Sequence, residues 1–212
     1  MMKETIIFII MTFSISYFIY YVLIHKKEIK EWIDSLNKRG ENTTTIKKDN
    51  RIEKILLCGK SGSGKDYISE LFNLVMIITH TTRPKRNYEV DHVHKHFHKA
   101  FKNEKDALDV ITDSSTIAWT KRGEYYYWAT MLDIESGNVY IIDVPGIQSI
   151  MNNRFANARY KFKVVYLGCP IYKRICNMLK RGEKIGSIIS RLYIDYRDFK
   201  KLENIKHTTI KF

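Results

Sequence analysis

The chain has 212 residues, of which 44% are hydrophobic and 13% aromatic. This length allows one globular domain with an appended segment and argues against two full domains. The formal net charge of +13 favours anionic partners such as nucleotides, nucleic acid or acidic lipids. The three cysteines show no CxxC spacing, which argues against a disulfide framework and fits a reducing compartment.

The segment 5–24 contains no charged residue and consists mainly of Ile, Phe, Tyr, Met, Val and Leu. As an α-helix it would extend about 30 Å, the thickness of a bilayer core. A cleaved signal peptide fits less well, because the apolar run is long and ends in His25-Lys26-Lys27. A buried core helix also fits less well, because the run has no polar face. We therefore predict an uncleaved transmembrane anchor at residues 1–25 that contacts the lipid bilayer through residues 5–24.

Positive charges near this segment lie mostly on its C-terminal side, so the positive-inside rule predicts a single-pass protein whose C-terminal domain is cytoplasmic. From residue 26 to about 36, apolar residues recur at helical spacing among charged ones. This pattern indicates either a helix on the membrane surface that binds acidic lipids or a solvated spacer. Residues 39–50 are polar and lack a period, so we assign 26–51 to a juxtamembrane helix and linker.

A short apolar run at 54–58, typical of a buried strand, leads directly into a glycine-rich loop, and apolar residues at helical spacing follow. The loop is Gly59-Lys60-Ser61-Gly62-Ser63-Gly64-Lys65. Strand, loop and helix in this order are the context of a P-loop, whose backbone N–H groups and helix N-terminus surround phosphate oxygens. Lys65 is expected to reach the β- and γ-phosphates of ATP bound with Mg²⁺.

The residue after the loop lysine is Asp66, where P-loops usually carry a Ser or Thr that helps to hold Mg²⁺. Its carboxylate could contact the metal directly or through water, or it could repel the nucleotide phosphates. Asp143 is the second predicted Mg²⁺ ligand, because P-loop enzymes carry an acid at the end of a neighbouring strand. The alternative for Asp143 is a helix N-cap.

Two arginines lie three positions apart, among hydroxyl side chains, in the segment Thr79-His80-Thr81-Thr82-Arg83-Pro84-Lys85-Arg86-Asn87-Tyr88-Glu89. Such a fork can hold the phosphate of an acceptor nucleotide in two places. The segment resembles the Ser-x-x-Thr-Arg-x-x-Arg-x-Gly-Glu pattern of guanylate kinases. This resemblance implies that Thr79, Arg83, Arg86 and Glu89 belong to the acceptor site. A basic surface loop is the alternative.

Two further segments resemble the same family. Gly123-Glu124-Tyr125-Tyr126-Tyr127 is similar to Gly-Asn-Tyr-Tyr-Gly, in which a tyrosine hydroxyl binds the acceptor phosphate. Tyr126 is the aligned residue. If the register shifts by one, Tyr127 takes its place. Arg181, followed by Gly182, and Arg191 resemble the lid whose arginines close over ATP and stabilise the transferring phosphoryl group. A solvated basic helix end is the alternative for the lid residues.

Several positions depart from the family pattern. Ile117, Trp128 and Lys95 stand where guanylate kinases carry the glutamate, serine and tyrosine of the guanine site, and Asn177 replaces a lid arginine. The sequence therefore does not name the base of the acceptor.

His92, His94, His96 and His98 alternate with other residues, so an extended strand would place all four on one face. We expect a solvated strand face over the acceptor site, with transition-metal binding as the alternative.

Together these segments predict an α/β, three-layer P-loop NTPase fold at residues 52–212, with a parallel sheet, an acceptor-binding insertion at about 79–130 and a lid. The predicted function is a membrane-anchored nucleoside or deoxynucleoside monophosphate kinase, which transfers the ATP γ-phosphate to a nucleotide such as GMP or dGMP. The alternative is a catalytically inactive guanylate kinase-like binding module at the membrane. Nucleic acid is not an expected partner.

Overall fold

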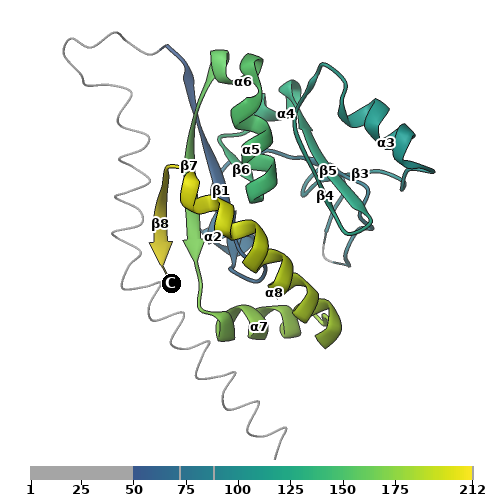
Figure 1. The fold of residues 1–212 in the computed structure, drawn as a ribbon, viewed down its shortest axis with the longest axis vertical. Coiled ribbons are helices and arrows are strands. Elements are labelled where there is room, and N and C mark those ends of the chain that lie inside the picture. The colour runs from purple at the N-terminus through teal and green to yellow at the C-terminus, as the bar shows by residue number, and fades with distance from the viewer. Residues whose placement is uncertain (1–49, 72, 88, 212) are drawn as a thin grey trace, which may run out of the picture.

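The computed structural model describes residues 50–71, 73–87 and 89–211 (Figure 1). The predicted anchor and nearly all of the predicted juxtamembrane segment lie outside these residues. Among the residues that are described, no helix is long and apolar enough to cross a membrane.

A four-stranded parallel sheet forms the centre of the domain, in the order β6-β1-β7-β8. Its strands are β1 (Ile52–Gly59), β6 (Val139–Ile141), β7 (Tyr160–Gly168) and β8 (His207–Lys211). The longest pairing joins β1 to β7 and runs from Ile52 opposite Tyr160 to Gly59 opposite Leu167. Helices cover both faces of such a sheet, so its central strands have continuous apolar runs in the sequence. The predicted parallel sheet is confirmed.

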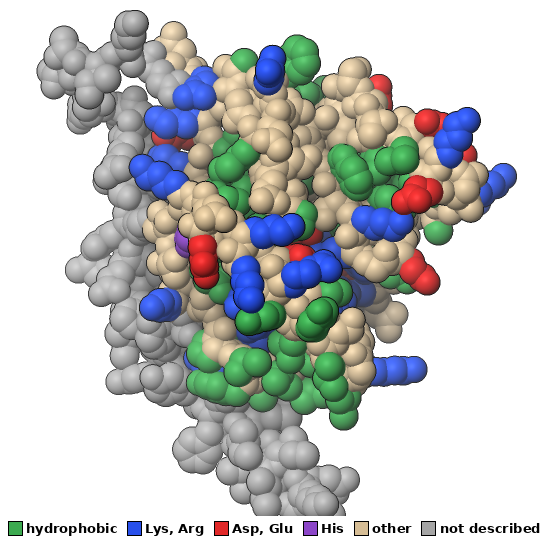
Figure 2. Space-filling view, viewed as in Figure 1, with side chains coloured by type: hydrophobic (Ala, Val, Ile, Leu, Met, Phe, Trp, Pro, Cys, Tyr) green, Lys and Arg blue, Asp and Glu red, His purple; other side chains and the backbone are tan. Residues whose placement is uncertain are grey.

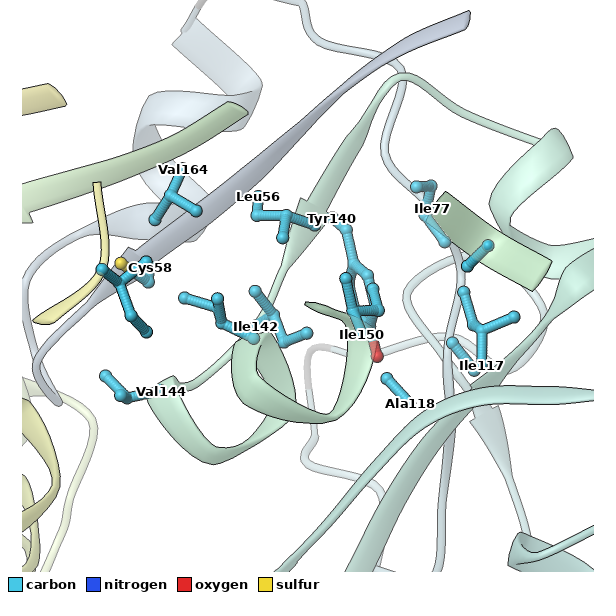
Figure 3. Close-up of a cluster of buried hydrophobic side chains, with 14 of the residues drawn as sticks. Leu56, Cys58, Ile77, Ile117, Ala118, Tyr140, Ile142, Val144, Ile150 and Val164 are labelled. Atoms are coloured by element: carbon cyan, nitrogen blue, oxygen red, sulfur yellow. The ribbon is translucent and has the colours of Figure 1, made fainter. Parts of the chain in front are cut away.

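Two apolar clusters lie on opposite faces of β1, because successive side chains of a strand point to opposite sides. Leu56 and Cys58 join the larger cluster, which includes residues of α5, α8 and η1 and is shown in part in Figure 3. Leu57 joins the smaller cluster with Ile68 of α2. The helices of the domain are α2 (Lys65–Leu71), α5 (Val144–Asn152), α6 (Arg154–Arg159), α7 (Ile171–Lys180), α8 (Ile185–Phe199) and the 3₁₀ helix η1 (Lys200–Asn204).

A second, mixed sheet lies where the sequence predicts the insertion, beside the parallel sheet in Figure 1, with the order β3-β2-β5-β4. Its strands are β2 (His80–Thr81), β3 (His96–Phe97), β4 (Thr116–Arg122) and β5 (Tyr125–Thr130). The short helices α3 (Glu104–Ile111) and α4 (Met131–Glu135) accompany it. Strands β4 and β5 form a hairpin whose turn includes Gly123 at a φ of 61°, a left-handed conformation that favours glycine.

The structure differs from the sequence expectations at β6 and in the histidine run, and it defines the C-terminal tail, for which the sequence predicts no element. Strand β6 ends at Ile141, because Asp143 accepts the Gly146 N–H and begins α5. The basic tail forms the edge strand β8 against β7. Within 92–98 only His96–Phe97 is strand, and His92 adopts a φ of 60°, so the four histidines do not share one face.

Candidate functional site

The glycine-rich loop joins β1 to α2, as the sequence predicts, and Lys65 is the first residue of the helix. Its Nζ donates a hydrogen bond to the Gly59 carbonyl at 2.6 Å and lies 3.4 Å from Ser63 Oγ. Burial lowers the pKa of Lys65 to about 8. The lysine therefore folds over its own loop, with its ammonium group directed at the space that the loop encloses.

Side chains from α7 and α8 hold the loop from behind. The Ser61 N–H donates to Asp195 Oδ2 at 2.7 Å, and Arg174 Nε donates to the Ser61 carbonyl at 2.9 Å. Arg174 and Asp195 also form an ion pair at 2.5 Å, with exposed side-chain fractions of 6% and 1%. Asn177 Nδ2 donates to the Gly62 carbonyl at 2.8 Å. We call these three side chains, Arg174, Asn177 and Asp195, the brace. The sequence analysis assigned none of them to ATP binding.

Gly62 is required for this close approach. Its φ is +75°, and a Cβ atom there would collide with the Arg174 carbonyl oxygen. The P-loop motif predicts this glycine from the sequence. The residue that it contacts, Arg174, lies more than a hundred positions later in the chain. The only local signal for Asp195 is that it lies one helical turn after the predicted lid residue Arg191.

The predicted acceptor loop is organised by Glu89. Arg83 Nη2 donates to both carboxylate oxygens, at 2.7 and 2.8 Å, and the Arg86 N–H donates to Oε2 at 2.8 Å. Burial of Glu89 would raise its pKa, but these hydrogen bonds and the two nearby guanidinium groups outweigh burial and hold the pKa below its usual value. The structure therefore brings Arg83, Arg86 and Glu89 together.

Lys95 lies beside Thr79 in the same region. Its Nζ donates to Thr79 Oγ1 at 2.6 Å, and burial lowers the pKa of Lys95 to about 8. Of the three positions that depart from the guanine site, only Lys95 lines the cleft. Ile117 is buried in the larger apolar cluster, and the Trp128 ring stacks on His80 at 5.2 Å between centroids.

The prediction for Tyr126 needs correction. Its side chain is buried with Ala107 and Ile111 of α3, on the face of β5 that points away from the cleft. Tyr125 and Tyr127 line the cleft instead, because side chains alternate along the strand. Tyr127 is the residue that the sequence predicts if the alignment with the family segment shifts by one position.

The acidic and lid residues pair with one another. Arg181 Nη2 lies 3.6 Å from Asp66 Oδ2, and Arg191 Nε lies 3.3 Å from Glu183 Oε2. Asp66 and Arg191 line the cleft. Arg181 lies in the short connection 181–184 between α7 and α8, whereas Arg191 lies within α8 and is paired with Glu183 of that connection.

Asp143 takes the N-cap role that the sequence left open as the alternative to a Mg²⁺ ligand. Oδ1 accepts the Gly146 N–H at 2.9 Å as the N-cap of α5. Oδ2 accepts hydrogen bonds from Arg122 Nε at 2.8 Å and Thr120 Oγ1 at 3.1 Å, and Asp143 lines the cleft. Its charge is therefore already matched by Arg122.

One cavity of about 620 Å³ connects these groups. The P-loop and α2 lie at one side, the acceptor loop and β5 at the other, and α8 along the edge. On the face drawn in Figure 2, Lys and Arg side chains gather around the middle of the view. Lys65, Arg83 and Arg86 therefore bring positive charge to one cleft, which favours anionic ligands.

The brace behind the P-loop gives a stability prediction. We expect Asp195→Ala to lower the free energy of unfolding by about 3–5 kcal/mol, because it leaves Arg174 charged and buried without its partner. Equilibrium urea unfolding measures the change. The control is Lys121→Ala, which removes an exposed partner of Glu104 and should leave the unfolding midpoint nearly unchanged. An Asp195→Ala protein as stable as the wild type would contradict this interpretation.

The depressed pKa of Glu89 gives a pH prediction. A carboxyl group with a lowered pKa in the folded state stabilises the fold above its unfolded pKa of 4.5 and loses this contribution as pH falls through the folded pKa. We expect Glu89→Gln to be less stable than the wild type at neutral pH, and the difference to shrink below pH 4.5. Urea unfolding of both proteins across this range measures it. A difference that stays constant with pH would contradict the assigned pairing.

No family model matches the chain. A guanylate kinase of Thermotoga maritima is 28% identical over 159 residues, which cover 65% of this chain and 68% of that protein. The crystal structure of a guanylate kinase from Anaplasma phagocytophilum aligns with a TM-score of 0.51 at 15% identity, over 76% of this chain and 78% of that one. At this identity the structural likeness shows the fold alone, and it agrees with the sequence relationship. The chain is guanylate kinase-like in both its sequence and its fold.

Proposed function

We propose that the chain is an ATP-dependent nucleoside monophosphate kinase that transfers the γ-phosphate to a nucleotide such as GMP or dGMP. The observation that carries this proposal is the single cleft lined by both the P-loop lysine, Lys65, and the acceptor loop with Arg83 and Arg86. Two phosphate groups bound in one cavity convert an encounter in solution into a reaction between fixed partners. The curated relative of similar sequence is itself named a guanylate kinase.

The residues of the cleft suit phosphoryl transfer, in which catalysis consists mainly of positioning and charge neutralisation. Lys65 and the loop N–H groups would hold the donor phosphates, and Arg83 and Arg86 the acceptor phosphate. Glu89 keeps both arginines at the cleft through its carboxylate. Arg181 and Arg191 would turn from their carboxylate partners toward the transferring group when the lid closes.

Mg²⁺ is the cation that such a donor needs, and it would neutralise phosphate charge during transfer. Asp66 fits it, since its carboxylate is more than half exposed, lines the cleft and directly follows Lys65. Asp143 fits less well, because both of its oxygens already accept hydrogen bonds and its charge is paired with Arg122. We therefore propose Asp66 as the protein ligand of Mg²⁺.

The alternative function is a binding module that has lost catalysis. It is favoured by the substituted base positions and by Asn177, which holds the P-loop where the resemblance implies a lid arginine. The kinase remains the better proposal, because Lys65, Arg83 and Arg86 are all present and placed at one cleft.

A panel assay tests the kinase. We expect the chain to phosphorylate at least one ribo- or deoxynucleoside monophosphate with ATP and Mg²⁺. Lys65→Ala and Arg83→Ala should each lower kcat/KM by about 100-fold or more, since each removes a charge that stabilises the transferring group. Coupled detection of ADP measures turnover for each nucleotide.

The matched control is Lys85→Ala. Lys85 lies between the two arginines in the same loop, but it is exposed and does not line the cleft, so its loss should leave kcat/KM nearly unchanged. Absence of turnover with every nucleotide, in a protein that still binds ATP, would reject the kinase and support the binding module.

We also propose that the protein is anchored by residues 5–24 as a single-pass membrane protein with its catalytic domain in the cytoplasm. The uncharged segment and the basic residues after it support this placement. The apolar outer face of α7 and α8, at the lower end of the view in Figure 2, is suited to lie near a bilayer with acidic lipids. The exposed large apolar and tyrosine side chains of α7 and α8 are those of Ile171, Tyr172, Leu179, Ile185, Ile189, Tyr193 and Tyr196.

Cell fractionation tests the anchor. We expect the full chain to sediment with membranes, to stay there during an alkaline carbonate wash and to be released by detergent. A chain that lacks residues 1–25 should not stay with the membranes during the carbonate wash. Protease added to inverted membrane vesicles should digest the domain if it faces the cytoplasm. Release of the full chain by carbonate alone would reject the anchor, and protection from protease would reject the orientation.

A further inference from the structure

A cluster of histidines lies on the face of β2 and β3 that is turned away from the cleft. His80 and His96 are directly paired in the parallel register of the two strands, and their ring centroids are 4.7 Å apart. Thr79 and Lys95, the residues just before them, line the cleft and are hydrogen-bonded to each other. Because side chains alternate along a strand, the two histidines form a separate group behind the acceptor site.

The third member of the group comes from α4. Asp133 Oδ2 lies 3.1 Å from His80 Nε2, and Asp133 Oδ1 lies 3.8 Å from His96 Nε2. One candidate ligand atom from each of the three residues lies within 4.8 Å of the other two. Ligand atoms about 2 Å from a tetrahedral Zn²⁺ are separated by about 3.3 Å, so only a small contraction would bring these atoms to that spacing.

Each candidate ligand is held by a hydrogen bond at its other polar atom. His80 Nδ1 lies 2.8 Å from His98 Nε2, and His96 Nδ1 lies 2.9 Å from His92 Nδ1. Asp133 Oδ2 accepts hydrogen bonds from the N–H and hydroxyl of Thr130, at 2.7 and 2.8 Å, which leaves Oδ1 facing His96. Metal-binding histidines and carboxylates are typically oriented by such partners.

We propose that His80, His96 and Asp133 bind a divalent transition metal of the zinc class. Two imidazole nitrogens and one carboxylate oxygen suit Zn²⁺ and leave a fourth position for water. The site differs in chemistry and place from the proposed Mg²⁺ position, because a hard cation such as Mg²⁺ prefers oxygen ligands alone. His98, His92 and Thr130 act as positioning residues.

A second group, Asp91, His92 and His96, overlaps with this site but is the weaker candidate. The His92 side chain is 76% exposed, whereas those of His80, His96 and Asp133 are 21%, 26% and 9% exposed. Asp91 Oδ1 already accepts the N–H groups of His92 and Phe97, at 2.9 and 3.0 Å, so it shapes the turn before β3.

The metal would join three elements that are far apart in the sequence: β2, β3 and α4. It would thereby fix the strand pair whose other face carries Thr79 and Lys95. Since the unfolded chain lacks this arrangement, binding of the metal should also stabilise the fold.

Metal titration of the full-length, untagged protein in a mild detergent tests the site. We expect one equivalent of Co²⁺ to give the intense visible absorption of tetrahedral coordination, and Zn²⁺ to displace it. His80→Ala and His96→Ala should abolish this signal. His98→Ala should weaken Zn²⁺ binding by about 10- to 100-fold, because it removes only an orienting partner. Zn²⁺ should raise the unfolding temperature of the wild type but not of His80→Ala.

The matched control is His94→Ala. His94 belongs to the same histidine run, but it lines the cleft and its Nδ1 accepts the Val90 N–H at 2.8 Å, so Co²⁺ binding should be unchanged. Circular dichroism without metal shows whether each variant folds. Folded wild-type protein without saturable binding would overturn the proposal, as would binding that survives in a folded His80→Ala variant but is lost in Asp91→Asn. These readouts do not depend on kinase activity.

Discussion

The donor half of the cleft depends on the buried ion pair between Arg174 and Asp195. A loop with three glycines in seven residues loses much conformational entropy when it adopts one shape, and its glycines offer no side chains to pack. The pair provides an acceptor for the Ser61 N–H and a donor for the Ser61 carbonyl. Burial of two charges is costly, but here they neutralise each other while each bonds to the loop backbone. The pair therefore specifies the shape of the loop more than it adds to overall stability.

The same two helices carry the predicted lid. Helix α7 contacts the loop through Arg174 and Asn177 and ends just before Arg181, whereas α8 carries Arg191 and Asp195 one turn apart. A pivot about the junction at 181–184 that moved α8 would carry Arg191 and Asp195 together, since both lie on this helix, and would strain the contact of Asp195 with Ser61. Because that contact is buried, reorientation of the arginine side chains costs less than a rigid movement of the helix. In the structure the Arg181 side chain is paired with Asp66, and the Arg191 side chain with Glu183.

The sequence predicts those parts of the site that depend on local chain geometry. Consecutive residues form the P-loop, and Arg83, Arg86 and Glu89 lie within one loop, so local motifs and their resemblance to a known pattern locate them. Tyr126 was misassigned because a run of three tyrosines on a strand gives no sign of which face is buried; the contact with α3 decides it. Asp195 could not be assigned, because its role arises when α8 packs behind a loop 134 residues away in the chain. The histidine run was misleading for a related reason: a turn at Asp91 and His92 breaks the expected alternation.

Strands β2 and β3 connect the acceptor site with the histidine cluster, since alternate residues of both strands serve opposite faces. Asp133 places a carboxylate on the rear face, behind the strands that carry Thr79 and Lys95 at the cleft. A divalent cation at His80, His96 and Asp133 would more than offset the charge of this carboxylate, and it would lie one layer of backbone away from the acceptor side of the cleft. The metal would then favour the acceptor in two ways, because it would both fix the strands that carry Thr79 and Lys95 and reverse the charge behind them. A cation outside the cleft would thus influence phosphate binding without touching either nucleotide.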